Sequence, residues 1–345
     1  PIDPMQPVPE PETHVPGRRS MPPPAPSGWY VVALSSELAP GARLTRPFFG
    51  GEVVVYRTAS GRVVATRPFC PHLGAHLGHS GRVEGETLRC SFHGFRFDAE
   101  GTCVEAYPQR RVPPACRLPL LPARERNGHV LVYHHPRGVA PTWEVPAIDD
   151  SGYRAPIYQT WDLAGHPQET SENSVDIGHL ASVHGYQQVA APEPMVADGP
   201  VLRGKYSMHR RSRWSDVTTE FAVQVWGLGY SVVDVHVVGH DVRTRQFVLA
   251  TPTDEGRISL RIGLALQRVG SKSALHPLAA LAPRFVLEAL IERAAFLAFR
   301  HDVSQDFSIW QAKTYLPRPA LADGDGPVGL YRKWTRQFYE DPPLR

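Results

Sequence analysis

The chain is poor in cysteine and carries little net charge. It has four cysteines in 345 residues, too few for the disulfide framework of a small secreted domain, and free thiols suit a reducing compartment. Basic and acidic residues are interspersed and leave a formal net charge of only +3, so the composition does not indicate a nucleic-acid partner. No apolar segment follows Arg18-Arg19, as an export signal would require. We therefore expect a cytoplasmic protein.

The chain also lacks a long uninterrupted apolar run. Its most apolar stretch, residues 275–299, contains prolines and charged residues, whereas a spanning helix needs about twenty mostly apolar residues. We expect no spanning membrane segment, although an interfacial helix through which a hydrophobic substrate enters stays open. Residues 1–27 contain ten prolines and no apolar run, which predicts a disordered or extended arm.

Two short segments each combine one cysteine with one histidine. Cys70 and His72 form a Cys-x-His pattern, and Cys90 and His93 follow as Cys-x-x-His after a gap of seventeen residues. Two thiolates and two imidazoles are the ligand set of a Rieske [2Fe–2S] cluster, in which one iron takes both sulfurs and the other both histidines. A Cys2His2 zinc site is the alternative, but zinc fingers usually pair like ligands. The words CPHLGAHL and CSFHGFRFD resemble Rieske cluster loops.

That resemblance also bears on the kind of cluster. Respiratory-chain Rieske proteins brace their two loops with a disulfide, and the positions it would occupy here are Ala75 and Phe92. We therefore expect an unbraced cluster of the lower-potential kind, as found in oxygenases and their ferredoxins.

A second group of candidate ligands lies about eighty residues further along. Asp176, His179 and His184 follow the pattern Asp-x-x-His-x4-His. Histidines five apart do not share one face of a regular helix, so by themselves they are more often packed or surface residues. Beside a Rieske cluster, they match the mononuclear iron motif of Rieske non-heme iron oxygenases position by position. A 2-His-1-carboxylate triad binds Fe(II) on one face and leaves positions open for O2 and substrate.

The third ligand of such a triad is expected far along the chain. The candidate is Asp306 in the pattern QD-x-x-IW-x-x-K, which resembles the ligand-bearing segment of steroid-hydroxylating family members. Asp302 competes with it, because it lies four residues earlier on the same helical face. A helix-surface acid without function is the plain alternative for Asp306.

Short runs of β-branched residues, separated by glycine and proline turns, predict an amino-terminal all-β part in an α+β chain. We expect a disordered arm over residues 1–27, a Rieske domain over 28–136 and a catalytic domain with the mononuclear iron over 137–345. The expected strands of the first domain include 51–56, 62–66 and 128–133. In the second domain we expect a helical stretch over 162–186, antiparallel strands over 221–226, 230–238, 245–251 and 257–266, and helices over 283–311 and 329–339.

From Gly28 to Tyr339 the chain resembles the oxygenase component of Rieske non-heme iron oxygenases, and looks most like 3-ketosteroid 9α-hydroxylase oxygenases and cholesterol 7-desaturases. The resemblance to this subfamily rests on three sequence segments, NSVDIGHLASVHGY, TPTDEG and GDGPVGLYRKWTRQFYED. It implies a helix-grip-like catalytic domain and a head-to-tail homotrimer. Asp176 matches an aspartate that bridges a cluster histidine, here His93, to an iron histidine of the neighbouring subunit, here His179. A carboxylate that orients a ligating histidine suits that role.

The resemblance implies reductive activation of O2 at a mononuclear Fe(II) to hydroxylate or desaturate a hydrophobic, steroid-like or polycyclic substrate. No Gly-x-Gly-x-x-Gly follows a strand and no Cys-x4-Cys-x2-Cys pattern occurs, so electrons must come from a separate NAD(P)H-dependent reductase or ferredoxin. Oxidative desaturation or cyclisation in natural-product biosynthesis stays open, as does Rieske electron transfer without oxygenase activity. Trp226, Tyr230, Phe247 and the segment 275–299 are candidate pocket residues, with ordinary core packing as the alternative.

Overall fold

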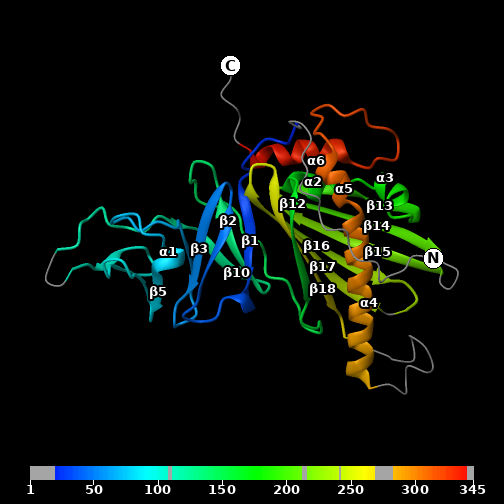
Figure 1. Cartoon of the computed structure of the whole chain (residues 1–345). Coiled ribbons are helices and arrows are strands. Elements are labelled where there is room, and N and C mark those ends of the chain that lie inside the picture. Colours follow the sequence, from blue (N-terminus) through cyan, green and yellow to red (C-terminus); the bar gives the residue numbers. More distant parts are fainter. Residues whose placement is uncertain (1–19, 108–110, 212–215, 241, 269–282, 340–345) are drawn as a thin grey trace. The chain divides into compact units, whose positions relative to one another are not determined.

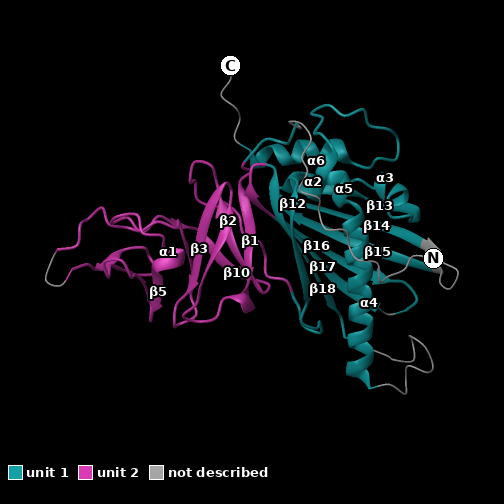
Figure 2. Ribbon diagram, in the orientation of Figure 1, with its two compact units in different colours: residues 1–24, 149–250, 256–345 teal, residues 25–148, 251–255 magenta. Residues whose placement is uncertain are grey.

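The computed structural model describes residues 20–107, 111–211, 216–240, 242–268 and 283–339. It divides into two compact units, coloured separately in Figure 2. Unit 2 comprises residues 25–148 and 251–255, and unit 1 comprises residues 1–24, 149–250 and 256–345. Most of the expected amino-terminal arm and residues 275–282 of the apolar stretch lie outside the described residues.

Unit 2 is built from short strands in three sheets, with orders β1-β11-β10, β2-β3-β4-β9 and β5-β6-β7-β8. Valine-rich runs form strands because β-branched side chains pack well on a pleated surface. In β3, the residues from Val53 to Arg57 are all buried. The strands are β1 Gly28–Leu34, β2 Arg43–Phe48, β3 Gly51–Arg57, β4 Val63–Thr66, β5 Gly81–Glu84, β6 Thr87–Cys90, β7 Arg96–Phe97, β8 Cys103–Glu105, β9 Leu120–Leu121, β10 Ala123–Arg126 and β11 His129–His134.

This architecture confirms the predicted all-β amino-terminal part. Two apolar clusters fill it, one containing Phe48 and Val55 and the other containing Leu88 and Phe97. The second cluster also contains Cys70 and Cys90, so the two candidate thiol ligands belong to a packed core. A short helix α1 (Leu77–Ser80) and a 3₁₀ turn (Ser35–Glu37) complete the unit.

Unit 1 contains a seven-stranded sheet with the order β12-β18-β17-β16-β15-β14-β13, and its hydrogen-bonded neighbours run antiparallel. Its strands are β12 Ile157–Ala164, β13 Gln187–Asp198, β14 Val201–Arg211, β15 Asp216–Trp226, β16 Tyr230–Val237, β17 Val242–Asp254 and β18 Arg257–Leu266. The large antiparallel sheet with few helices confirms the expected α+β class.

In the described residues of unit 1, five helices and a 3₁₀ turn accompany the sheet. They are α2 Pro167–Glu172, α3 Gly178–Ser182, α4 Arg284–Gln305, α5 Phe307–Ala312, α6 Val328–Thr335 and a 3₁₀ turn Arg336–Phe338. Figure 1 shows α4 lying against the sheet, and Phe296 of α4 packs on Ile262 and Leu264 of β18. No helix in the described part of the chain combines the length and apolarity needed to cross a membrane.

The strand order explains how the candidate ligands meet. Strands β12 and β13 lie at opposite edges of the sheet, so α2 and α3, which join them, must run from one edge to the other. Helix α4 follows β18 and packs back on the same sheet. Segments far apart in the chain are thereby brought together.

Several local expectations differ from the structure. The predicted helix over 283–311 is interrupted at Asp306, where α4 ends and α5 begins. Strands β13 and β14 were not predicted. In β13, Pro192 and Pro194 would argue against a strand interior. β13 is the edge strand of the sheet, where proline is tolerated because its missing N–H is not needed by a second neighbour.

Candidate active site

Two loops of unit 2 share one hydrogen-bonding pattern. The Cys70 N–H donates to the Ala75 carbonyl at 2.8 Å, and the Gly74 N–H donates to the Cys70 carbonyl at 2.9 Å. The second loop repeats this, from the Cys90 N–H to the Phe95 carbonyl and from the Gly94 N–H to the Cys90 carbonyl, both at 2.8 Å. Gly74 and Gly94 have φ of +74° and +79°, a backbone region that favours glycine. The glycines after each histidine therefore close two equivalent turns.

The four predicted cluster residues are brought together by these turns. The His72 and His93 ring centroids lie 4.7 Å apart. Cys70 and Cys90 are buried, and their side chains are close enough to interact. Burial raises the pKa of the Cys70 thiol to about 11, so thiolate at neutral pH would need a bound metal to stabilise it. Paired thiols beside paired imidazoles fit a [2Fe–2S] cluster of the Rieske kind.

All four cysteines are free. At the two positions where a bracing disulfide would lie, Ala75 packs against the apolar cluster of Cys70 and Cys90, and Phe92 is 61% exposed. Cys103 and Cys116 belong to the same buried cluster.

In unit 1, His179, His184 and Asp306 form a second candidate metal centre. One ligand atom from each lies within 4.8 Å of the others. The His184 Nε2 and Asp306 Oδ2 atoms are 3.6 Å apart, and both side chains are less than a tenth exposed. Two imidazole nitrogens and one carboxylate oxygen are the donor set of a mononuclear iron site with open positions, so these residues fit the group.

Each of the three side chains is held by a neighbour. The Asp176 carbonyl accepts from His179 Nδ1 at 2.5 Å, and the Gln305 amide oxygen accepts from His184 Nδ1 at 2.9 Å. The Asn173 amide donates to Asp306 Oδ2 at 2.9 Å. With Nδ1 used as a donor, each imidazole offers Nε2 to a metal.

Burial and charge shift the acidity of this centre. Burial raises the pKa of Asp306 and outweighs the opposing effect of the His184 and His179 imidazoles. Burial alone would lower the pKa of His179, but the hydrogen bonds with Asp176 and the charge of Asp306 leave it raised. Partial burial would raise the pKa of Asp176, but the hydrogen bonds that it accepts from His179 leave this pKa lowered.

The structure places the two candidate aspartates differently. Asp302 Oδ2 accepts a hydrogen bond from the Tyr186 hydroxyl at 2.7 Å. Asp306 instead lies with the two histidines, at the junction of α4 and α5. Both aspartates line the same cavity.

That cavity has a volume of about 290 Å³ and is mostly apolar. Its sheet side is formed by one face of β14 to β17, and its helix side by α4, with the three candidate ligands in its wall. Tyr230 and Phe247 are not among its lining residues; they are buried on the opposite face of the sheet, and Trp226 is on that face too. Representative lining residues are Tyr206, Met208, Phe221, Val235, Val248, Ala295, Phe299 and Val303.

Sequence reasoning missed Asn173 and Gln305 as neighbours of the ligands. Both stand beside quoted motif residues, Asn173 in ENSVD and Gln305 in QD. Their partners are 133 and 121 residues away in the chain, so no local periodicity could reveal the contacts.

Comparisons with known proteins agree with this architecture. Residues 28–119 match the Rieske [2Fe-2S] domain, and residues 132–339 match the 3-ketosteroid 9alpha-hydroxylase C-terminal domain. A cholesterol 7-desaturase of Xenopus laevis is 29% identical over 93% of this chain and 73% of its own length. The oxygenase component of a 3-ketosteroid-9-alpha-monooxygenase of Rhodococcus rhodochrous is 27% identical over 91% of this chain and 84% of its own. Crystalline dicamba monooxygenase shares the fold, with a TM-score of 0.64 at 18% identity over 90% of this chain and 96% of its own.

A Rieske domain, followed by a sheet domain with two histidines and an aspartate at an apolar cavity, defines the class of Rieske non-heme iron oxygenases. Within that class, the chain belongs to the 3-ketosteroid 9α-hydroxylase family. It is an oxidoreductase whose cofactors are a [2Fe–2S] cluster and a mononuclear iron. As an oxygenase component, it receives electrons from a separate reductase or ferredoxin.

Proposed function

We propose that this protein is a terminal oxygenase that hydroxylates or desaturates a hydrophobic, steroid-like substrate. The observation that carries the proposal is the convergence of His179, His184 and Asp306 in the wall of a mostly apolar cavity. Relatives named as a steroid monooxygenase and sterol desaturases support a steroid-like substrate. A lining of valine, alanine and aromatic side chains favours an apolar polycyclic ligand over a charged one.

The two metal groups have separate sets of ligands in this proposal. His179, His184 and Asp306 hold the mononuclear iron, which when bound supplies the redox chemistry that activates O2 with electrons delivered through the cluster. Gln305 and the Asp176 carbonyl hold the two imidazoles so that each presents Nε2. The four cluster ligands are Cys70, His72, Cys90 and His93.

We also propose a head-to-tail homotrimer. Around the cluster histidines, Phe69, Leu73 and Phe92 are more than half exposed, and exposed apolar side chains of this kind often mark an interaction surface. In such a trimer, Asp176 would bridge His93 of the neighbouring subunit to His179. The Asp176 side chain is 36% exposed, which leaves it accessible to a second chain.

The electron donor and the location follow from the same chemistry. An NAD(P)H-dependent reductase, directly or through a ferredoxin, is the donor we propose. Four free thiols, two of them proposed cluster ligands, suit the reducing cytoplasm.

Metal analysis combined with turnover tests the function. We expect three irons and two inorganic sulfides per chain, and an O2-dependent hydroxylated or desaturated product when the pure protein is mixed with a 3-ketosteroid, a reductase and NADH. Iron and sulfide in a two-to-two ratio, without product, would identify a Rieske electron-transfer protein instead. Bound zinc without inorganic sulfide would instead contradict the assignment of the [2Fe–2S] cluster.

A further inference from the structure

Helix α2 is a polar helix that is buried along its whole length. Its sequence is PQETSE, and all six residues from Pro167 to Glu172 are buried. Buried polar groups destabilise a fold unless partners satisfy them. Here the partners come from the carboxy-terminal part of the chain. The Tyr331 hydroxyl of α6 lies 2.7 Å from the Gln168 carbonyl and 2.6 Å from the Ser171 hydroxyl.

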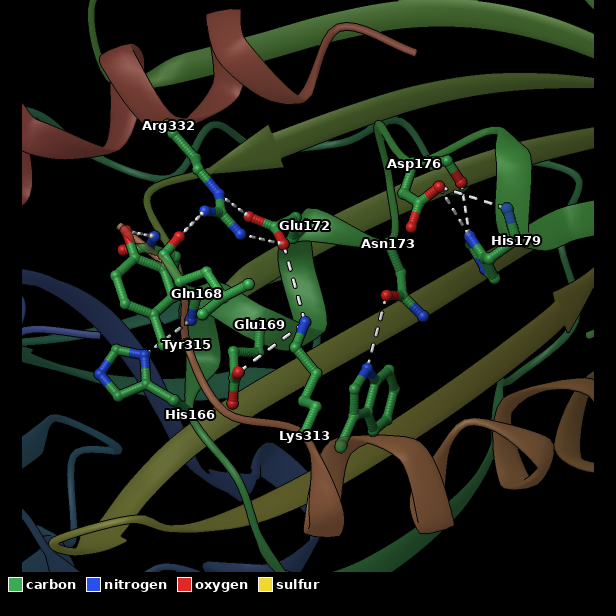
Figure 3. A network of polar contacts seen from close by, with 12 residues as sticks. His166, Gln168, Glu169, Glu172, Asn173, Asp176, His179, Lys313, Tyr315 and Arg332 are labelled. Carbon is green, nitrogen blue, oxygen red and sulfur yellow. Dashed lines mark hydrogen bonds and ion pairs between the residues drawn. The ribbon is translucent and has the colours of Figure 1, made fainter. Parts of the chain in front are cut away.

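The two carboxylates of α2 are matched by two cations. Arg332 of α6 donates to both carboxylate oxygens of Glu172, at 2.7 and 2.9 Å. Lys313, just after α5, has its Nζ 3.8 Å from Glu169 Oε1 and 3.7 Å from Glu172 Oε1. Glu169 is only 1% exposed. Figure 3 shows the Lys313 ammonium between the two carboxylates.

The residue that follows α2 touches the candidate iron site. Asn173 donates through its amide to Asp306 Oδ2 at 2.9 Å, and its amide oxygen accepts from the Trp310 ring nitrogen at 3.4 Å. Asp306, Trp310 and Lys313 are spaced by four and three residues, so they lie along one face of the α5 segment. On the facing segment, Asn173 and Glu169 are likewise four apart. Two kinds of contact thus join the two segments. Asp306 and Trp310 are hydrogen-bonded to Asn173, and Lys313 forms an ion pair with Glu169.

Stability alone does not account for this cluster. Replacing a buried set of charges by apolar groups of similar size is often neutral or stabilising, whereas removing one partner strands a buried charge. Such a cluster can instead provide positional specificity, because each ion pair restricts where its helix can sit. The helix in question ends one residue before the amide that holds Asp306.

We propose that Lys313 is a positioning residue for the mononuclear iron site. By pairing with both α2 carboxylates, it holds α2 against α5 and so keeps the Asn173 amide on Asp306. This inference rests on the proposed assignment of His179, His184 and Asp306 as iron ligands. A simple counter-ion would neutralise Glu169 and have no effect on the metal.

The test measures the dissociation constant of mononuclear Fe(II) by chelator competition, with the cluster absorption and the thermal midpoint followed in parallel. We expect Lys313→Met to weaken iron binding by about ten-fold, at the lower end of the effect typical for residues that orient ligands. Lys313→Arg should restore the affinity. Glu169→Gln combined with Lys313→Met should recover the thermal midpoint, because no buried carboxylate is stranded, but should leave iron binding weak. Lys333→Met, on an exposed lysine of α6, is the matched control.

Two results would overturn the proposal. The first is unchanged iron affinity in Lys313→Met. The second is recovery of both stability and iron affinity in the double variant, which would make Lys313 a counter-ion only. If Lys313→Met fails to fold, the double variant decides by its iron affinity. His184→Ala is the reference without a mononuclear site. Wild-type protein that releases iron as readily as His184→Ala would instead contradict the proposed function.

Discussion

Asp176→Asn tests the proposed electron route most directly. Asp176 contacts His179 in two ways. Its backbone carbonyl accepts from the ring Nδ1 at 2.5 Å, while its carboxylate Oδ1 accepts from the His179 N–H at 3.2 Å and lies 3.8 Å from Nδ1. The substitution leaves the backbone contact unchanged, and an amide oxygen still accepts from the N–H. We therefore expect the variant to keep both the cluster and the mononuclear iron.

What the substitution removes is one negative charge. Opposite unit charges about 4 Å apart interact by about 4 kcal/mol at an effective dielectric constant near 20 and by about 1 kcal/mol in water. The Asp176 side chain is 36% exposed, which places the loss toward the lower value, at about 1 to 2 kcal/mol. A loss of this size changes the equilibrium constant of any step that depends on the charge pairing between Asp176 and His179 by roughly 5- to 30-fold.

Electron transfer adds a second loss. In the proposed trimer, Asp176 also carries the contact to the neighbouring subunit's cluster, so the kinetic effect should exceed the roughly 10- to 100-fold typical of residues that orient a ligand. We expect oxidation of the pre-reduced cluster by O2, in the presence of substrate, to slow by more than about 100-fold. Stopped-flow absorbance at the cluster band measures this rate.

The matched control is Asp198→Asn. This aspartate has a side chain that is 77% exposed and pairs with Arg203 at 3.6 Å, so the variant loses the same charge away from the site. Its cluster should be oxidised at the wild-type rate. Near-normal oxidation in Asp176→Asn would refute the reasoning: Asp176 would be a structural acid, and the trimeric route would lose its support.

Two further predictions concern the carboxylates and the pH response. Asp306→Ala should remove the mononuclear iron and all turnover while the Rieske spectrum persists. Asp302→Ala, which removes the acceptor of the Tyr186 hydroxyl and no proposed iron ligand, should retain the iron; the reverse outcome would exchange the two assignments. Burial lowers the pKa of His166 to about 3, well below the 6.5 of an unfolded histidine. Between these two values the unfolded chain binds one proton more than the folded chain. The free energy of unfolding therefore falls as the pH drops from about 6.5 toward 3. His166→Asn keeps a side-chain acceptor for the Gln168 N–H. Urea titrations should show that this variant reduces the slope of unfolding free energy against pH by up to about 1.4 kcal/mol per pH unit. An unchanged slope would show that His166 is not buried in its neutral form.

The cluster loops were readable from sequence because everything they need is local. Each cysteine is followed within a few residues by its histidine and by a glycine that closes the turn with positive φ. Hydrogen bonds between Cys70 and Ala75 and between Cys90 and Phe95 stay within each motif. The residues of such a motif are therefore sufficient to predict the shape of its loop. The all-β character of unit 2 was equally visible, since its valine-rich runs are separated by glycine and proline turns.

Edges and junctions of the second unit were harder to predict. Proline argues against a strand in isolation, yet β13 accommodates Pro192 and Pro194 because it is the edge strand of the sheet. Sequence periodicity likewise runs through Asp306 without a break, whereas the structure ends α4 there. Position within a sheet or at a helix junction is a property of the whole fold.

By itself, the sequence determined which residue types could hold two metal groups and where the paired cysteines and histidines stand. Only the tertiary structure decided what surrounds them. It placed Asp306 beside His184 and turned Asp302 to Tyr186, although both aspartates share one helical face. It also buried the polar sequence PQETSE, whose side chains are satisfied by cations and hydroxyl groups from residues 313–339. Such partners lie more than a hundred residues away, where pairing depends on the return of the chain across the sheet and not on local spacing.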